Sequence, residues 1–351
     1  MSASAGSVAA GPLPFPDGCD IVLPLFDLQW STRAVLEGLF ARYTPRAVYV
    51  ITPEANRAAL LHASTAEAWR APRLHVIPEE GFFTARHGRT KQDLASTLDL
   101  AGSLYKPGWF YQQLLKLGAD EGIASLSDAF LVWDADLLLV GGWPAVEANG
   151  RPCYALLQDS SRGNAEIVSR WSRWIRSVLG VEPAVDPAGR ATFVPHHMWF
   201  VQQHLRTLRE RIADYYGDRA TPWPELMMRS AGEFGTFSEF WLYASWVAAR
   251  HSDTAPHALP YHRYGATTER FFEDGTAPFA QAARQYLDAD PEAPFRPAYV
   301  ELVGFIEQAY ADAGRPLPSS LSFEASPRHR HKGRANMHVE ELRSPWHTAA
   351  D

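Results

Sequence analysis

The stretch Ala129-Phe-Leu-Val-Trp-Asp-Ala-Asp-Leu-Leu-Leu-Val140 places two carboxylates, Asp134 and Asp136, at a break in an otherwise apolar run. The apolar residues indicate a buried strand, where an ionised carboxylate is costly and two close carboxylates raise each other's pKa. A cation between the carboxylates would remove this cost. Side chains at i and i+2 of a strand share one face, about 6.6 Å apart, so both carboxylates are expected at one site.

Such a pair is typical of an Asp-x-Asp site for a metal ion and a diphosphate. Mg²⁺ and Mn²⁺ are commonly held by one or two carboxylates together with the phosphate oxygens of a substrate. The alternative is an aspartate-rich strand end or turn without a ligand, because short motifs also occur by chance. The uninterrupted apolar residues on both sides favour the metal site. We therefore predict Mn²⁺ or Mg²⁺ as the cofactor.

The composition is that of an ordinary globular chain. Of the 351 residues, 46% are hydrophobic and 21% are charged, which is enough to bury a substantial core. The formal net charge of -7 argues against binding to nucleic acid or to an anionic membrane surface. No run approaches the roughly 18 apolar residues of a transmembrane helix, so no membrane insertion is expected. The two cysteines, Cys19 and Cys153, form no disulfide framework, which favours a reducing, cytoplasmic location.

Short apolar runs alternate with helical patterns in the first part of the chain. Strands are predicted at residues 20–26, 47–52 and 74–77, and helices from a cap at Ser31 through Phe40 and over residues 53–69. This order predicts an α/β fold with a mainly parallel central sheet and helices on both faces. Ligands bind at the carboxyl ends of such strands, so Asp27, Thr52, Glu79 and the Asp-x-Asp pair are expected to line one cleft.

The pattern is less regular beyond residue 84. Pro107 and Gly108 are expected to open a helix that runs to Leu117. Further strands are predicted at 153–157, 192–200 and 257–264, and helices at 169–179, through Arg211, at 237–250 and at 299–313. Because no strong linker is present, we interpret residues 1–18 as a disordered leader and residues 19–315 as a single domain. Residues 316–351, rich in Pro, Ser, Arg and His, are expected to form a C-terminal extension or lid.

Three boxes carry a resemblance to a known family. Gly108-Trp-Phe-Tyr-Gln-Gln-Leu-Leu-Lys-Leu117, followed by Phe130-Leu-Val-Trp-Asp-Ala-Asp136, resembles a largely uncharacterised family of glycosyltransferase-like proteins with a GT-A-type fold. Phe237-Ser-Glu-Phe-Trp-Leu-Tyr243 is similar to the third box of that family. The resemblance implies a GT-A-like, Rossmann-like domain with a nucleotide-sugar-binding half at 19–140 and an acceptor half at 141–315. It also implies transfer of a sugar from a nucleoside diphosphate sugar to a hydroxyl of a glycan or glycoconjugate.

The resemblance also suggests how the two aspartates divide their roles. Asp136 is expected to bind the metal directly, and Asp134 to bind the ribose hydroxyls or a metal-bound water. A divalent ion with a nearby lysine or arginine would stabilise the charge on the departing diphosphate. Gln113 and Lys116 lie three residues apart on one helical face and could reach the donor. The alternative is that this face is simply exposed to solvent.

Glu239 is the second carboxylate of interest. It precedes an apolar run and could begin a helix, where the helix dipole favours a carboxylate. Alternatively, it reaches the acceptor hydroxyl and serves as general base in an inverting displacement, or fixes the acceptor in a retaining one. The sequence leaves both roles open.

Histidines form a third group of candidates. His196 and His197 are neighbours in a predicted strand, so only one of them can face the cleft. In the tail, His329, His331 and His338 are candidates for the late histidine that many GT-A enzymes add to the metal, and we assign His338 to this role. Imidazole favours Mn²⁺ over Mg²⁺. The alternative is a solvated, His- and Arg-rich tail.

Strand-end geometry predicts a pocket for the base and ribose. Its expected residues are Pro24, Phe26, Asp27 and Thr52, although these could be ordinary loop residues.

Two other functions remain open. One is a nucleotidyl- or phosphotransferase, which also uses paired aspartates with a divalent ion, although the chain has no Gly-x-x-x-x-Gly-Lys-Ser/Thr loop. The other is a catalytically silent carbohydrate-binding protein on the same fold.

Overall fold

A computed structural model describes most of the first 250 residues and parts of the remainder. The described residues are 13, 15–28, 31–65, 73–141, 145–146, 157–158, 165–185, 191–192, 194, 196–250, 268–270, 298–314, 317 and 320–322. The predicted strand at 257–264 and the candidate ligands His329, His331 and His338 lie outside these residues. Within the described part, no helix combines the length and apolar character needed to cross a membrane.

A five-stranded sheet forms the centre of the fold. Its strands are β1 (Asp20–Pro24), β2 (Val48–Thr52), β3 (Leu74–Pro78), β4 (Ala129–Trp133) and β8 (His197–Val201), in the order β3-β2-β1-β4-β8. Four strands are parallel, and β8 runs antiparallel to β4. Every residue of β1 and β2 is buried, as expected for mainly apolar strands that are covered on both faces. The expected α/β class with a mainly parallel sheet is confirmed.

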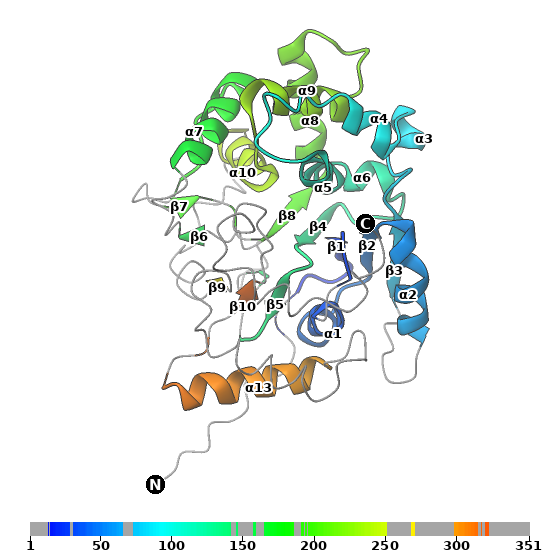
Figure 1. Ribbon diagram of the computed structural model, residues 1–351, viewed down its shortest axis with the longest axis vertical. Coiled ribbons are helices and arrows are strands. Elements are labelled where there is room, and N and C mark those ends of the chain that lie inside the picture. Colours follow the sequence, from blue (N-terminus) through cyan, green and yellow to red (C-terminus); the bar gives the residue numbers. More distant parts are fainter. Residues whose placement is uncertain are drawn as a thin grey trace.

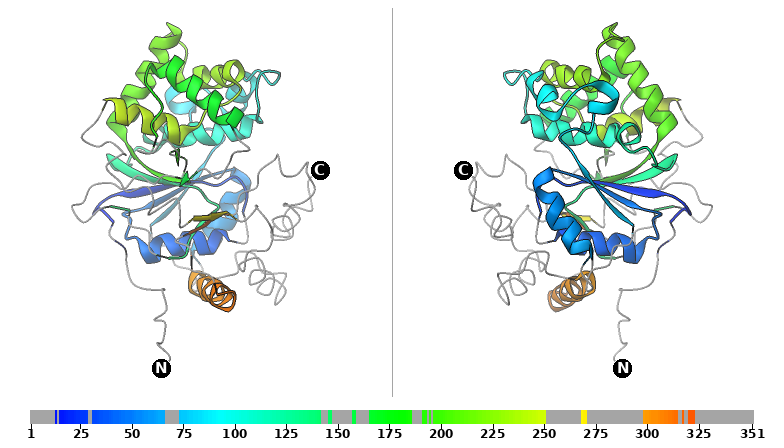
Figure 2. Two further views of the ribbon diagram at one scale, coloured as in Figure 1. Left: turned by 90° about the vertical axis from the view of Figure 1, so that its left-hand side faces the viewer. Right: turned by 90° about the vertical axis from the view of Figure 1, so that its right-hand side faces the viewer.

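Helices cover both faces of this sheet (Figures 1 and 2). The helices α1 (Thr32–Arg42) and α13 (Tyr299–Asp312) pack together on one face. On the other face, α5 (Pro107–Leu117) packs against β1, and α8 (Gln202–Tyr216) packs against β8. The helix α10 (Glu239–Arg250) contacts both α5 and α8, and α2 (Glu54–Thr65) lies beside β3. The expected helices on both faces are therefore present.

Shorter elements complete the described fold. The helical ones are α3 (Thr84–His87), α4 (Lys91–Ser96), α6 (Ala119–Gly122), α7 (Ala165–Trp174), the π-helical continuation η2 (Ile175–Leu179) and α9 (Trp223–Phe234). The strands are β5 (Leu137–Leu139), β6 (Leu157–Gln158), β7 (Ala191–Thr192), β9 (Thr268–Arg270) and β10 (Ser320–Ser322). They form a three-stranded sheet, β5-β10-β9, and a two-stranded sheet, β6-β7.

Several sequence predictions require correction. The single strand expected at 192–200 is two short strands, β7 and β8. The helix α9 was not predicted, although Glu225, Arg229 and Glu233 recur every four residues along it, because ten of its twelve residues are buried and its polar face is narrow. Ser31 precedes α1 as expected, but its side chain makes no capping hydrogen bond, since its backbone is already helical with φ -79° and ψ -11°.

The segment expected to be a disordered leader contributes to the core near its end. Phe15 is buried, with its ring centroid 5.3 Å from those of Tyr43 and Trp199. The backbone nitrogen of Leu13 donates to the carbonyl of Arg42 at 2.5 Å. These residues therefore belong to the folded domain, because aromatic burial of this kind stabilises the chain that carries it. The boundaries at 140 and 315 stay predictions.

A buried ion pair fixes α5 to the helices around it. Arg209 on α8 binds both carboxylate oxygens of Asp120 on α6, at 2.6 and 2.7 Å, and both side chains are less than one tenth exposed, at 8% and 7%. The Nη1 atom of Arg209 also donates to the carbonyl of Leu117, the last residue of α5, at 2.9 Å. One side chain thus connects α8 to the helix that carries Lys116.

Arg209→Met should lower the free energy of unfolding by about 3–5 kcal/mol, because it leaves the Asp120 carboxylate buried without its bidentate partner. Urea unfolding measures this change. The matched control is Arg219→Met, which breaks a pair with Asp214 at a site where the arginine is 76% exposed. That change should stay within about 1 kcal/mol. Equal losses in the two variants would contradict the prediction.

Candidate functional site

The Asp-x-Asp residues lie in a turn at the carboxyl end of β4. The strand ends at Trp133, the backbone nitrogen of Leu137 donates to the carbonyl of Asp134 at 3.1 Å, and β5 then begins. The sequence suggested that the two carboxylates share one face of a continuous strand. This prediction is wrong, because both residues lie between β4 and β5. Both side chains are half-buried. The turn, and not the strand, brings the two carboxylates to one site. This site lies at the carboxyl edge of the sheet, where ligands bind in parallel α/β folds.

His196 joins the two aspartates. Because β8 pairs antiparallel with β4 and His197 lies opposite Trp133, the preceding residue falls beside Asp134. The backbone nitrogen of Asp134 donates to the carbonyl of His196 at 2.8 Å, and Nδ1 of His196 lies 3.2 Å from Oδ2 of Asp134. His196 has a φ of 65°, an uncommon conformation for a residue with a Cβ atom that is over-represented at functional sites.

The three residues form a group that could hold a metal ion. One ligand atom each from Asp134, Asp136 and His196 lies within 4.8 Å of the others. Two carboxylates with one imidazole are a donor set that suits Mn²⁺. His197 turns away, is buried and packs its ring 5.0 Å from that of Trp133. Of the adjacent histidines, only one therefore faces the site, as predicted.

Lys116 lies between two carboxylates beside this group. Its Nζ is 2.5 Å from Oδ1 of Asp134 and 2.5 Å from Oε1 of Glu239, and the side chain is only 3% exposed. Nζ also lies 4.4 Å from the ring centroid of Phe240. The alternative of a solvated helix face is wrong for this residue. The ammonium is directed to the protein's own carboxylates.

Gln113 and Glu239 complete the cluster. The Gln113 side chain is buried, and its Oε1 accepts a hydrogen bond from the backbone nitrogen of Glu239 at 2.9 Å. Glu239 is the first residue of α10, so the predicted helix start is confirmed. Gln113 and Lys116 do share one helical face, and that face binds the first residue of α10. Their expected contact with a donor stays a prediction.

Charge and burial act against each other in this cluster. Burial opposes ionisation of Asp134, but the Lys116 ammonium and the His196 hydrogen bond outweigh it and hold the pKa of Asp134 below its usual value. Burial raises the pKa of Glu239, with Lys116 opposing and Asp134 adding to the rise. Burial would lower the pKa of Lys116, but Asp134 and Glu239 raise it, so the lysine stays charged. Asp134 and Glu239 share one ammonium, and Asp136 lies in one group with Asp134, so the cluster has an excess of negative charge that suits a cation.

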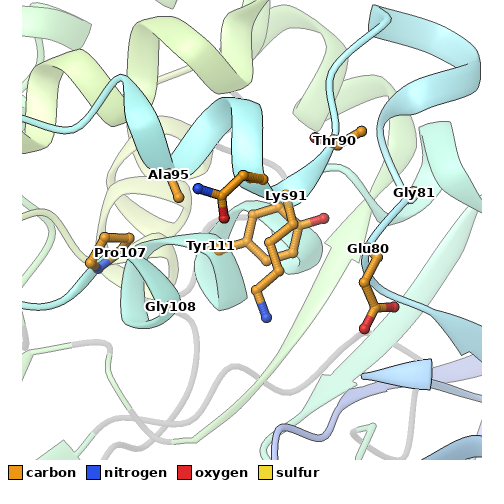
Figure 3. A pocket seen from close by; sticks show the side chains of 9 residues that line it. Glu80, Gly81, Thr90, Lys91, Ala95, Pro107, Gly108 and Tyr111 are labelled. Carbon is orange, nitrogen blue, oxygen red and sulfur yellow. The ribbon is translucent and has the colours of Figure 1, made fainter. Parts of the chain in front are cut away.

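A pocket of about 490 Å³ lies at the other end of α5 (Figure 3). It is lined by Glu80, Gly81, Thr90, Lys91, Gln92, Ala95, Pro107, Gly108 and Tyr111. Lys91 forms an ion pair with the buried carboxylate of Glu79, and its Nζ lies 5.5 Å from the ring centroid of Tyr111. The Tyr111 hydroxyl donates to the carbonyl of Glu79. These contacts join α4 and α5 to the end of β3.

The predicted base and ribose residues lie at the same sheet edge. Pro24 and Thr52 are buried at the ends of β1 and β2, and Asn56 donates to both the Thr52 hydroxyl and the Phe26 carbonyl, at 3.0 and 2.9 Å. Phe26 is 59% exposed, and its ring centroid lies 5.4 Å from Nζ of Lys91. Asp27 contributes to raising the pKa of Glu79, behind the larger effect of burial. All four residues therefore lie near the pocket or at the strand ends that lead to it.

The helix α5 connects the pocket to the acidic cluster. Tyr111 lines the pocket and Lys116 binds Asp134, and five residues of helix span about 7.5 Å along the axis.

Lys91 was not predicted as a site residue, because its only local signal is the capping box of α4 formed by Thr90 and Asp93. The sequence left open whether His196 or His197 faces the cleft, because the pairing register of β8 cannot be read from a local pattern.

Comparisons with known proteins identify a family. The model of a family of unknown function, DUF6492, matches residues 34–271, which contain all three boxes. No curated protein matches the chain. Among solved structures, the galactosyltransferase LgtC in complex with donor and acceptor sugar analogues is 13% identical over 92% of this chain and 95% of that chain, with a TM-score of 0.37.

Two other solved structures are similar at the same level. Mouse xyloside xylosyltransferase 1 is 11% identical over 81% of this chain and 96% of that chain, with a TM-score of 0.37. The bifunctional glycosyltransferase WbbM is 11% identical over 98% of this chain and 53% of that chain, with a TM-score of 0.38. The activities and ligands named for these structures are those of the proteins concerned.

Proposed function

We propose that this chain, which belongs to the DUF6492 family of unknown function, is a metal-dependent glycosyltransferase that uses a nucleoside diphosphate sugar. All three boxes that carried the resemblance lie within the residues matched by the family model. The observation that carries the proposal is the Asp134–Asp136–His196 group at the carboxyl edge of a parallel sheet. The pocket at the other end of α5 supports it, because a donor has both a diphosphate and a nucleoside to bind.

Asp134, Asp136 and His196 would hold the divalent ion. When bound there, the ion neutralises charge that develops on the departing diphosphate. Lys116 forms an ion pair with Asp134, one of the two carboxylates of this group. The lysine fixes the Asp134 carboxylate in place, and a carboxylate held in advance needs little reorganisation when the charge develops.

The pocket is proposed to receive the nucleoside. Ligand pockets of roughly 300–1,000 Å³ are largely apolar with a few polar groups that set orientation, and this pocket has that character. Tyr111, Ala95 and Pro107 supply apolar surface, while Lys91 and Glu80 supply charge at the margin. The exposed ring of Phe26 lies next to Lys91 and offers a face on which a ring can stack.

Glu239 is proposed to act on the acceptor. Its burial and its raised pKa favour proton acceptance at neutral pH, and Lys116 and Gln113 fix its position. The acceptor would be a hydroxyl of a glycan or glycoconjugate. If Glu239→Gln transferred sugar to acceptor at the wild-type rate, Glu239 would not be the base.

The test is a panel of nucleoside diphosphate sugars incubated with the full chain, with Mn²⁺ or with chelator. We expect one or two donors to release nucleoside diphosphate only with metal. Release of pyrophosphate or nucleoside monophosphate would instead indicate a nucleotidyl- or phosphotransferase. Glycan binding that is independent of metal, with no turnover of any donor, would indicate a silent carbohydrate-binding protein.

A further inference from the structure

We infer that Lys116 is a built-in counter-cation that sets the affinity of the Asp134–Asp136–His196 group for its divalent ion. This inference rests on the proposed metal centre and concerns a positioning residue. Lys116 binds Asp134, which is one of the three expected ligands, and it also binds Glu239. The lysine therefore links the metal group to the residue proposed to act on the acceptor.

The position of the ammonium is fixed from several directions. The side chain extends from the last turn of α5 and is 3% exposed, so it cannot withdraw into solvent as a surface lysine does. The ring of Phe240, the residue after Glu239, lies 4.4 Å from Nζ. The Lys116 ammonium therefore contacts residues at the end of β4 and at the start of α10, while its own side chain extends from the end of α5.

The fixed ammonium of Lys116 and a divalent ion would both bind the Asp134 carboxylate. Two like charges a few ångströms apart in a partly buried site repel each other strongly, so the lysine weakens binding of the free ion. A diphosphate carries negative charge that offsets both cations. The ion and the diphosphate should therefore bind with positive coupling, each raising the affinity for the other.

The test titrates the protein with MnCl₂ alone and counts free Mn²⁺ by electron paramagnetic resonance. Lys116→Met keeps a long, unbranched side chain and removes the charge, so Mn²⁺ should bind about tenfold more tightly or better. The matched control is Lys106→Met, which makes the same change in an exposed lysine preceding the other end of α5. At that distance the charge is screened, and the affinity should stay unchanged.

A second variant covers the case in which Lys116→Met does not fold. Lys116→Met with Glu239→Gln removes one positive and one negative charge, so it avoids leaving two unpaired buried carboxylates, and it should also bind Mn²⁺ more tightly than the wild type. Equal or weaker binding in the folded variants overturns the inference and leaves the metal centre intact. If neither the wild type nor the variants bind Mn²⁺, with or without nucleoside diphosphate, the metal centre itself is wrong.

Discussion

Asp136→Asn is expected to reduce kcat/KM for the preferred donor by about a thousandfold or more and to abolish stabilisation of the protein by donor and Mn²⁺. The amide keeps the size of the side chain but removes its charge, so the metal group retains one carboxylate that is already paired with Lys116. Removing one preorganised group that stabilises the transition-state charge typically costs about 10²–10³ in rate. Loss of the metal ion removes more than one such interaction.

The control for this change lies at the opposite end of β4. Asp128 is exposed and immediately precedes β4, whereas Asp136 lies beyond the other end of β4. Asp128→Asn removes the same charge from the amino edge of the sheet and should leave kcat/KM and thermal stabilisation unchanged. Activity in Asp136→Asn that is comparable with activity in Asp128→Asn would exclude Asp136 as a metal ligand.

Gly108→Phe is expected to weaken donor binding by about tenfold or more, equivalent to at least about 1.4 kcal/mol, because the added ring occupies the pocket. Gly108 lines the pocket in the first turn of α5, and a Cβ atom built there meets nothing within 4 Å. The helix gains from losing a glycine, so the fold should be retained. Equilibrium dialysis with the donor identified by the panel measures the change.

Gly108→Ala provides the matched comparison. Its single methyl group fits the open space, so donor affinity should change little, and the melting temperature of both variants should equal or exceed that of the wild type. If Gly108→Phe bound donor as tightly as Gly108→Ala, the nucleoside would have to lie elsewhere. Turnover of donor by Gly108→Phe at saturation would still be expected, because the metal group is untouched.

The sheet was predictable from local sequence. Uninterrupted apolar runs such as Val48–Thr52 are favourable only in strands buried on both faces, and alternation with helices makes such strands parallel. The position of Asp134 and Asp136 at a carboxyl edge followed from the same reasoning. Their turn conformation did not, because the apolar residues on both sides suggest one continuous strand. The helix α9 has only a narrow polar face, formed by Glu225, Arg229 and Glu233, and this weak periodic signal was missed.

The partners of the site residues depend on tertiary structure. The spacing of Gln113 and Lys116 placed them on one face of a helix, but only the packing of α10 against α5 shows that both reach Glu239. The position of His196 beside Asp134 depends on the register between β8 and β4, which are separated by more than 60 residues. Long-range pairing of this kind has no local signature.

The most direct test is a crystal structure of the protein with Mn²⁺ and the nucleoside diphosphate of the preferred donor, using anomalous scattering to locate the metal. We expect the metal peak to lie within coordination distance of Asp136 and at least one of Asp134 and His196, with diphosphate oxygens completing the shell and the nucleoside directed to the pocket at Tyr111. A manganese ion bound by other residues, or a diphosphate bound away from Asp136, would contradict the account.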